Sequence, residues 1–211
     1  MFKFKNYFHV AENYFDKEFC QKVIESAKTG EYGIHDRNVE GIRKSEVVFF
    51  PHPEHDEDTK WLYDPVFDLL EETKKKYWRT FKLDRLQDLQ YTMYYSDGGY
   101  YNWHTDTAGH NDPGDAGTAS NQRMASRTLS LSIHLNDPDE YTGGELEIVK
   151  SVSDNIWKVM WGQEPDRDLV ETVRLGQGSA LIFPSVIQHR VLPVHGGQRQ
   201  SLVGWCTGRM V

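Results

Sequence analysis

Three side chains that can bind a metal ion lie close together in the segment YYNWHTDTAGH, residues 100–110. His104 and Asp106 are two positions apart, so both would project from the same face of a β-strand. His110 follows in a stretch rich in Gly, Asn and Asp, where the sequence does not constrain its direction. A His-x-Asp pair by itself is a weak signal, because a solvated strand end is its commoner explanation. A metal site here requires a further ligand from a distant segment.

The segment FPSVIQHRVLPVHGGQRQSLVGW, residues 183–205, can supply that ligand. His189 opens a predicted strand, Arg199 begins the next one after a predicted HGGQ turn, and Ser201 shares the face of Arg199. Two imidazoles and one carboxylate leave three octahedral positions of a metal open, which suits the oxygen chemistry of Fe(II). A small dicarboxylate would chelate the iron at one end and pair with Arg199 at the other, where Ser201 adds a hydroxyl. Taken singly, His189 could be a core histidine and Arg199 a surface arginine in a salt bridge, but their joint occurrence in this order, among predicted strands, argues against both explanations.

Two helices and a strand are predicted in the first part of the chain. Asp16 is a suitable N-cap for a helix over residues 17–29, which has apolar residues at helical spacing and ends at Gly30. The run SEVVFFP, residues 45–51, is typical of a short buried strand closed by proline. A second helix is predicted over residues 65–81, with one apolar face.

From residue 88 the chain consists of short apolar runs separated by turn residues. We expect strands in DLQYTMYY, ASRTLSLSIHLN, GELEIVK, TVRL, SALIFP, HRVLPV and RQSLVGW. This order predicts a mainly β protein, a sandwich or jelly roll that carries N-terminal helices. We expect one domain, with a helix-and-strand support layer in residues 1–87 and a jelly-roll catalytic core in residues 88–211.

Three further segments lie outside this pattern. Residues 107–122 and 150–173 look like insertions, and long loops in a compact domain are usually functional lids or disordered. The first follows the His-x-Asp pair directly, so we expect it to lie over the mouth of the site. The motif HPEH, residues 52–55, is surrounded by acidic residues and is interpreted as a solvated loop rather than a second metal site.

The composition excludes several classes of protein. A chain of 211 residues is long enough to bury a full core, and its net charge of −8 argues against binding to nucleic acid. No apolar run approaches the roughly 20 residues of a membrane span, and the N-terminal residues lack the pattern of a signal peptide. Cys20 and Cys206 are far apart in apolar surroundings, so we expect two buried free thiols and a cytoplasmic protein without a membrane partner.

The motifs together resemble those of the Fe(II)- and 2-oxoglutarate-dependent dioxygenases, in particular the prolyl 4-hydroxylase-like branch. The resemblance covers residues 91–205, over half of the chain. It consists of an aromatic residue, a glycine pair, Tyr and His-x-Asp, then an arginine-led strand ending in Leu-Asn-Asp before Gly-Gly-Glu, then a histidine followed ten residues later by arginine. These elements are met by Tyr95, Gly98, Gly99, Tyr101, His104, Asp106, Arg127, Leu135, Asn136, Asp137, Gly143, Gly144, Glu145, His189 and Arg199.

The resemblance implies a double-stranded β-helix core and a defined set of site residues. It implies His104, Asp106 and His189 as ligands of Fe(II), and Arg199 as the partner of the distal carboxylate of 2-oxoglutarate. Ser201, Tyr94 and His134 are further candidates for contacts with that cosubstrate. The alternative role of Tyr94 is packing in the sheet, and His134 stands where many relatives carry a tyrosine.

The implied reaction is hydroxylation of an unactivated C–H bond by dioxygen, with conversion of 2-oxoglutarate to succinate and carbon dioxide. The branch favours a prolyl residue in a peptide or protein as substrate, and ascorbate as an additional cofactor. A free amino acid or another small molecule remains an alternative substrate. Two other classes stay open: a hydrolytic zinc enzyme, which leaves Arg199 without a role, and a non-catalytic jelly-roll protein with a structural metal.

Overall fold

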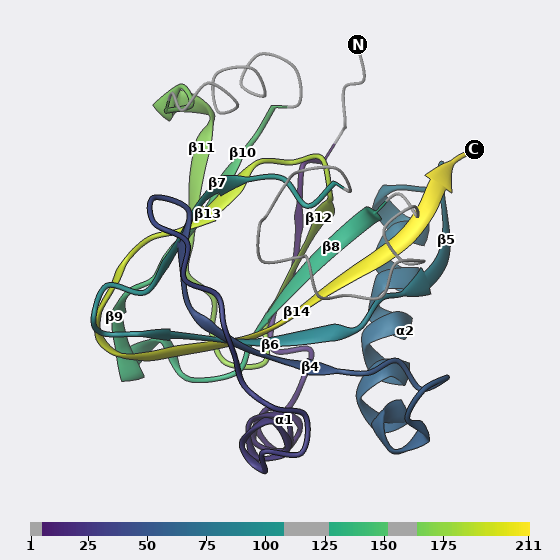
Figure 1. The fold of residues 1–211 in the computed structure, drawn as a ribbon. Coiled ribbons are helices and arrows are strands. Elements are labelled where there is room, and N and C mark those ends of the chain that lie inside the picture. Colours follow the sequence, from purple (N-terminus) through teal and green to yellow (C-terminus); the bar gives the residue numbers. More distant parts are fainter. Residues whose placement is uncertain (1–5, 108–126, 152–163) are drawn as a thin grey trace.

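The computed structural model describes residues 6–107, 127–151 and 164–211, and within these ranges the strands form two antiparallel sheets (Figure 1). The larger sheet has the order β1-β12-β8-β14-β6-β4-β2, and β5 and β9 also pair with β14. The smaller sheet has the order β11-β10-β13-β7-β3. The strands are β1 His9–Ala11, β2 His35–Asp36, β3 Arg43–Lys44, β4 Glu46–Phe50, β5 Phe81–Leu86, β6 Leu89–Tyr95, β7 Tyr100–His104, β8 Arg127–His134, β9 Tyr141–Gly143, β10 Leu146–Val149, β11 Val170–Val173, β12 Ala180–Pro184, β13 His189–Val191 and β14 Val194–Met210.

The two α-helices, α1 Lys17–Lys28 and α2 Lys60–Tyr77, pack on one face of the larger sheet. Alternate residues of its strands point to opposite faces, as the period of a β-strand requires. In β12, Ala180 and Ile182 join the apolar cluster that contains the helices, whereas Leu181 and Phe183 join a second cluster with residues of the smaller sheet. The layers are therefore helices, larger sheet and smaller sheet. The prediction of a mainly β, jelly-roll-like fold with flanking helices is confirmed.

Helix α1 agrees with its prediction, because the side chain of Asp16 accepts a hydrogen bond from the backbone N–H of Phe19 at 2.7 Å. The prediction for α2 was wrong at both ends. The helix begins at Lys60, after a 3-10 turn at Glu57–Thr59, and Pro65 lies inside it. Pro65 removes one backbone hydrogen bond from the helix, and the buried apolar face, which includes Leu62 before it and Val66 after it, stabilises the helix on both sides of the proline. At the other end, the run from Phe81 alternates between buried and exposed residues and forms β5.

Several strands also differ from the predictions. Strand β14 runs through the HGGQ segment without a turn: it begins at Val194, pairs with β9, and shifts register between Val194 and Gly196. Strand β11 begins two residues before the predicted TVRL strand, residues 172–175, and ends at Val173. It pairs with β10, so this part of the segment 150–173 belongs to the smaller sheet and was wrongly interpreted as an inserted loop. The short strands β1, β2, β3 and β9 were not predicted.

Other predictions concern single positions or fall outside the described ranges. Cys20 and Cys206 are buried free thiols, as expected. His110 and nearly all of the predicted lid over residues 107–122 lie outside the described residues, as do residues 152–163. In the part of the chain that the structure describes, neither helix has the length and apolar character needed to cross a membrane.

Candidate active site

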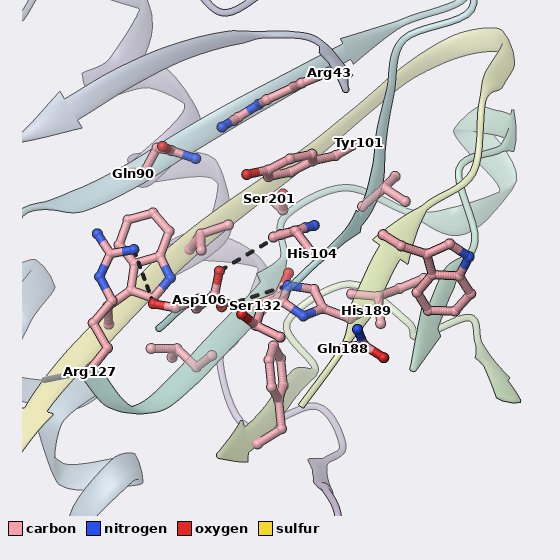
Figure 2. Close-up of a pocket in the computed structure, with 18 of the residues that line it drawn as sticks. Arg43, Gln90, Tyr101, His104, Asp106, Arg127, Ser132, Gln188, His189 and Ser201 are labelled. Carbon is pink, nitrogen blue, oxygen red and sulfur yellow. Dashed lines mark hydrogen bonds and ion pairs between the residues drawn. The ribbon is translucent and has the colours of Figure 1, made fainter. Parts of the chain in front are cut away.

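Strands β7 and β13 bring together the two histidines that the sequence singled out. His189 is the register partner of His104 in this antiparallel pair. Asp106 follows β7, and its backbone N–H donates to the carbonyl oxygen of Ser185 at 2.9 Å, which turns the chain after the strand. The three side chains each present one ligand atom, and these atoms lie within 4.8 Å of one another (Figure 2). The structure thus gathers all three residues predicted as metal ligands.

Backbone carbonyls fix the orientation of both imidazole rings. Nδ1 of His104 lies 2.8 Å from the carbonyl oxygen of Asn102, and Nδ1 of His189 lies 3.1 Å from that of Ile187. A proton on Nδ1 makes each of these a hydrogen bond and leaves the lone pair of Nε2 directed at the centre. The Nε2 atoms lie 3.7 and 3.6 Å from the two carboxylate oxygens of Asp106. Both histidines therefore offer Nε2 to one point.

The charges at this centre fit a divalent cation. Burial, together with the neighbouring His189, lowers the pKa of His104 to about 3, so its imidazole is neutral at physiological pH. Burial would raise the pKa of Asp106, but the neighbouring side chains of His189, His104 and Arg127 outweigh it and lower the pKa, so the carboxylate is ionised. Its Oδ2 is buried and has no hydrogen-bond partner among the residues that the structure describes. Two imidazoles and a buried carboxylate with a free oxygen are a donor set for a metal such as Fe(II).

Arg199 of β14 is a buried cation close to these ligands. It is 1% exposed, its Nη1 donates to Oγ of Ser201 at 3.1 Å, and its Nη2 lies 3.3 Å from Nε2 of His134. Burial and the charge of Arg199 hold the pKa of His134 well below its usual value, so the neutral imidazole accepts from the guanidinium. Nε of Arg199 has no hydrogen-bond partner, and no carboxylate of the described residues forms an ion pair with this side chain. A buried guanidinium in this state is suited to an anionic ligand.

A cavity of about 490 Å³ connects the candidate metal ligands with Arg199. His104, Asp106 and His189 line it, and so does Arg199. Of the other candidates for cosubstrate contacts, Tyr94 and Ser201 line the cavity, while His134 lies behind Arg199 and is absent from the described lining residues. The guanidinium of Arg199 lies 5.5 Å from the centre of the Tyr94 ring.

A sequence model of the 2OG-Fe(II) oxygenase superfamily matches residues 89–207, which contain all of these groups. The chain belongs to this superfamily. Membership of the 2OG-Fe(II) oxygenases confirms the family that the sequence motifs implied, and with it ferrous iron and 2-oxoglutarate as the cofactor and cosubstrate. Ascorbate stays a prediction.

Curated relatives of this oxygenase include a PKHD-type hydroxylase of Acidovorax ebreus. It is 34% identical over 111 residues, which cover 53% of this chain and 39% of the relative. The matched part thus spans only about two fifths of that relative's length.

Solved structures share the fold of this 2OG-Fe(II) oxygenase at low sequence identity. The prolyl-4-hydroxylase of Pseudomonas putida is similar with a TM-score of 0.66 and 17% identity, over 97% of this chain and 94% of that protein. A prolyl hydroxylase of Trichoplax adhaerens, solved with a peptide fragment of the hypoxia inducible factor oxygen degradation domain, gives a TM-score of 0.68 and 16% identity, over 96% and 84% of the two chains.

Several residues of the oxygenase site were not assigned to it from the sequence. Arg127 was noted only as part of a motif; its Nη1 lies 3.5 Å from the backbone carbonyl oxygen of Asp106, and its guanidinium lies 4.1 Å from the centre of the Trp205 ring. Trp205 was interpreted as core, yet it lines the cavity. Arg43 also lines the cavity and was not considered. The period of β14 places Trp205 on the face of Arg199 and Ser201. The period of β8 would instead place Arg127 on the helix side with Leu129 and Ile133, and it reaches the site because the register of β8 and β14 shifts between Cys206 and Thr207. The two-residue strand β3 offers no such pattern for Arg43.

Proposed function

We propose that His104, Asp106 and His189 hold Fe(II) and that Arg199 binds the distal carboxylate of 2-oxoglutarate in a hydroxylase. The observation that carries this proposal is the convergence of three ligand atoms within 4.8 Å, from segments distant in the sequence. They lie beside a buried arginine that has no anionic partner in the described part of the chain. A hydrolytic metal site would have no use for that arginine.

The remaining candidates act around Arg199 in this proposal. Ser201 accepts a hydrogen bond from the guanidinium and adds a hydroxyl that can donate to the same carboxylate. Tyr94 forms the neighbouring wall of the cavity. His134 accepts from Nη2 of Arg199 and so positions the guanidinium rather than contacting the cosubstrate.

The two parts of the single domain have different tasks. We assign the catalytic core to residues 88–211, which contain every proposed ligand of the metal and of the cosubstrate, and a supporting role in the fold to residues 1–87. The support is direct, because β4 pairs with β6, and β5 pairs with the C-terminal half of β14. The helices bury the opposite face of this sheet and so hold Tyr94 and Arg199 toward the cavity.

When bound, ferrous iron and 2-oxoglutarate would supply the electrons that activate dioxygen, the oxidant, for hydroxylation of a C–H bond, with 2-oxoglutarate converted to succinate and carbon dioxide. The chain contributes binding, orientation and exclusion of water. Tyr101 stacks on His104 with 3.5 Å between ring centroids, and Phe183 lies edge-on to His189 at 4.6 Å. These rings fix the imidazoles and, with Val191 and Leu146, make one wall of the cavity apolar.

The proposed substrate is a prolyl residue in a peptide or protein. Support comes from the fold shared with the prolyl-4-hydroxylase of Pseudomonas putida and with the Trichoplax adhaerens enzyme that was solved with a peptide fragment. The cavity lies beside Trp103 and Tyr101, whose rings offer flat surfaces for a pyrrolidine ring.

Mass spectrometry of proline-containing peptides tests the proposal. Incubation with Fe(II), 2-oxoglutarate and air is expected to add one oxygen atom to a peptide and to form succinate in equal amount, and the His189→Ala variant is expected to do neither. Succinate formation with a small molecule but with no peptide would keep the oxygenase and reject the peptide substrate. Product that forms without 2-oxoglutarate would reject the oxygenase itself.

A further inference from the structure

Arg43 is a buried arginine of the same cavity to which the proposed iron and cosubstrate sites give no role. It lies on β3 at the edge of the smaller sheet and is 6% exposed. Its Nε donates to Oγ of Ser45 at 2.6 Å, but its Nη2 is buried and finds no hydrogen-bond partner in residues 6–107, 127–151 and 164–211. Burial removes the water that would accept a hydrogen bond from Nη2, and no protein acceptor in the described residues replaces it. This loss costs free energy unless a ligand accepts the hydrogen bond.

The ring of Tyr101 lies between Arg43 and the proposed metal ligands. The guanidinium carbon of Arg43 is 4.6 Å from the centre of this ring, and the ring stacks on His104 (Figure 2). The face of an aromatic ring attracts a cation but offers no acceptor for an N–H of the guanidinium plane. Tyr101 therefore stabilises the charge of Arg43 only in part and leaves Nη2 available.

The net charge of the cavity also favours an anionic ligand. The described residues that line it include three arginines, Arg43, Arg127 and Arg199, but only one carboxylate, that of Asp106. A divalent metal adds two positive charges, and a dicarboxylate cosubstrate offsets no more than two. The excess of positive charge is local, because the chain as a whole carries a net charge of −8. A neutral carbonyl of a substrate would satisfy Nη2 but would leave this excess unbalanced.

We propose that Arg43 binds a carboxylate of the substrate, so that the enzyme selects a substrate with an acid group near the C–H bond to be hydroxylated. This inference rests on the proposed function and narrows its substrate class. The carboxylate belongs either to a free amino acid or to an acidic side chain beside the modified residue of a peptide. In both cases the planar fork of Arg43 matches the two oxygens of the group, while Tyr101 holds the fork in place.

Calorimetric titration without oxygen tests this selection, because the ligand binds and does not react. The full chain is loaded with Fe(II) and saturating 2-oxoglutarate, and each acid is compared with its own amide. One series uses the free proteinogenic amino acids and their carboxamides. The other uses blocked proline peptides that carry Asp or Glu against the same peptides with Asn or Gln. We expect that in one of these two series the carboxylic acid binds about 10-fold or more tightly than the matching amide, because only the acid forms a charge-assisted pair with Arg43.

Variants at neighbouring positions of β3 assign the preference to Arg43. The acid-to-amide ratio is expected to fall to about one in Arg43→Gln and to persist in Lys44→Gln, which removes the same charge from an exposed pair with Asp97. Arg43→Lys keeps the charge without the fork, and an intermediate ratio is expected, which covers the case in which Arg43→Gln fails to fold. The inference is overturned by equal binding of acids and amides in both series, or by a preference that survives the loss of Arg43. Absence of 2-oxoglutarate binding to the parent protein would instead count against the proposed function.

Discussion

His189 on β13 lies directly opposite His104 on β7, and the centroids of their imidazole rings are 4.1 Å apart. The antiparallel register of two short strands therefore sets the separation of two ligands that are distant in the sequence. Asp106, just beyond β7, lies within 3.7 Å of both rings.

This relationship predicts that each histidine is required for metal binding. His104→Ala and His189→Ala are both expected to weaken binding of Fe(II) by more than about 100-fold, beyond the roughly 10–100-fold effect of losing a residue that only orients a ligand. Metal analysis after anaerobic dialysis measures the loss. The control is His195→Ala, which removes an exposed histidine and should leave one iron per chain. Full occupancy in either ligand variant would contradict the assignment.

The cosubstrate site predicts a stabilisation that depends on Arg199. At 100 times its dissociation constant, 2-oxoglutarate should stabilise the metal-loaded protein by about 2.7 kcal/mol. For a chain of this size the midpoint of thermal unfolding should rise by about 5–10 °C. Arg199→Ala should abolish the rise, because it removes the cation that pairs with the distal carboxylate. Arg209→Ala, an exposed arginine of the same strand, should keep it. An equal rise in both variants would place the cosubstrate elsewhere.

The low pKa of His104 predicts that the metal-free protein loses stability in mild acid. The pKa is about 3 in the folded protein against 6.5 for an ordinary histidine, so between these values the unfolded chain binds more protons. The free energy of unfolding should fall as the pH drops below 6.5, with a loss on the order of 2 kcal/mol at pH 5 from this group. Asp106 does not contribute at pH 5, because its pKa is lowered from 3.8.

Urea unfolding at pH 7.5 and pH 5 in the presence of a chelator measures this effect. The His104→Gln variant should lose clearly less stability than the parent protein between the two pH values. An identical loss in both proteins would show that other groups carry the acid sensitivity.

Gly144 is predicted to hold Arg199 in place through close packing. Its φ is +69°, and an added Cβ would lie 2.9 Å from Cδ of Arg199. Gly144→Ala should therefore combine backbone strain of about 1–2 kcal/mol with displacement of the guanidinium, and lower the affinity for 2-oxoglutarate about 10-fold or more. Gly33→Ala is a matched control, because Gly33 has a φ of +68° and open space around the added Cβ. It should lose stability but no cosubstrate affinity; equal affinity losses would remove Gly144 from the site.

The sequence was sufficient for the residues whose spacing repeats with the period of their element. His104 with Asp106, and Arg199 with Ser201, share a face because they are two positions apart near or within strands, and the apolar stripe of α1 predicted its buried side in the same way. Gly143 and Gly144, which belong to the motif that carries the resemblance, both have positive φ.

The features that the sequence did not predict depend on contacts between distant segments, which leave no local pattern in the sequence. The segment HGGQ, where a turn was expected, is part of β14 because β9 pairs with it there. Helix α2 begins before the expected start at Pro65, because its first turn already buries Leu62 and Tyr63. Arg43 lies on a strand of two residues, which is defined only by its pairing with Tyr101 and Tyr100 of β7. Pairing partners of this kind become visible only when the whole sheet is assembled.

We propose that His104, Asp106 and His189 share one Fe(II) ion next to the 2-oxoglutarate bound by Arg199. Anaerobic addition of Fe(II) and 2-oxoglutarate gives the sharpest test, through the weak visible charge-transfer band of the metal chelate. We expect this band in the parent protein and its loss in His104→Ala and His189→Ala. In Arg199→Ala the band should return only at much higher 2-oxoglutarate concentration. A band of unchanged intensity in either histidine variant would show that the metal is held elsewhere.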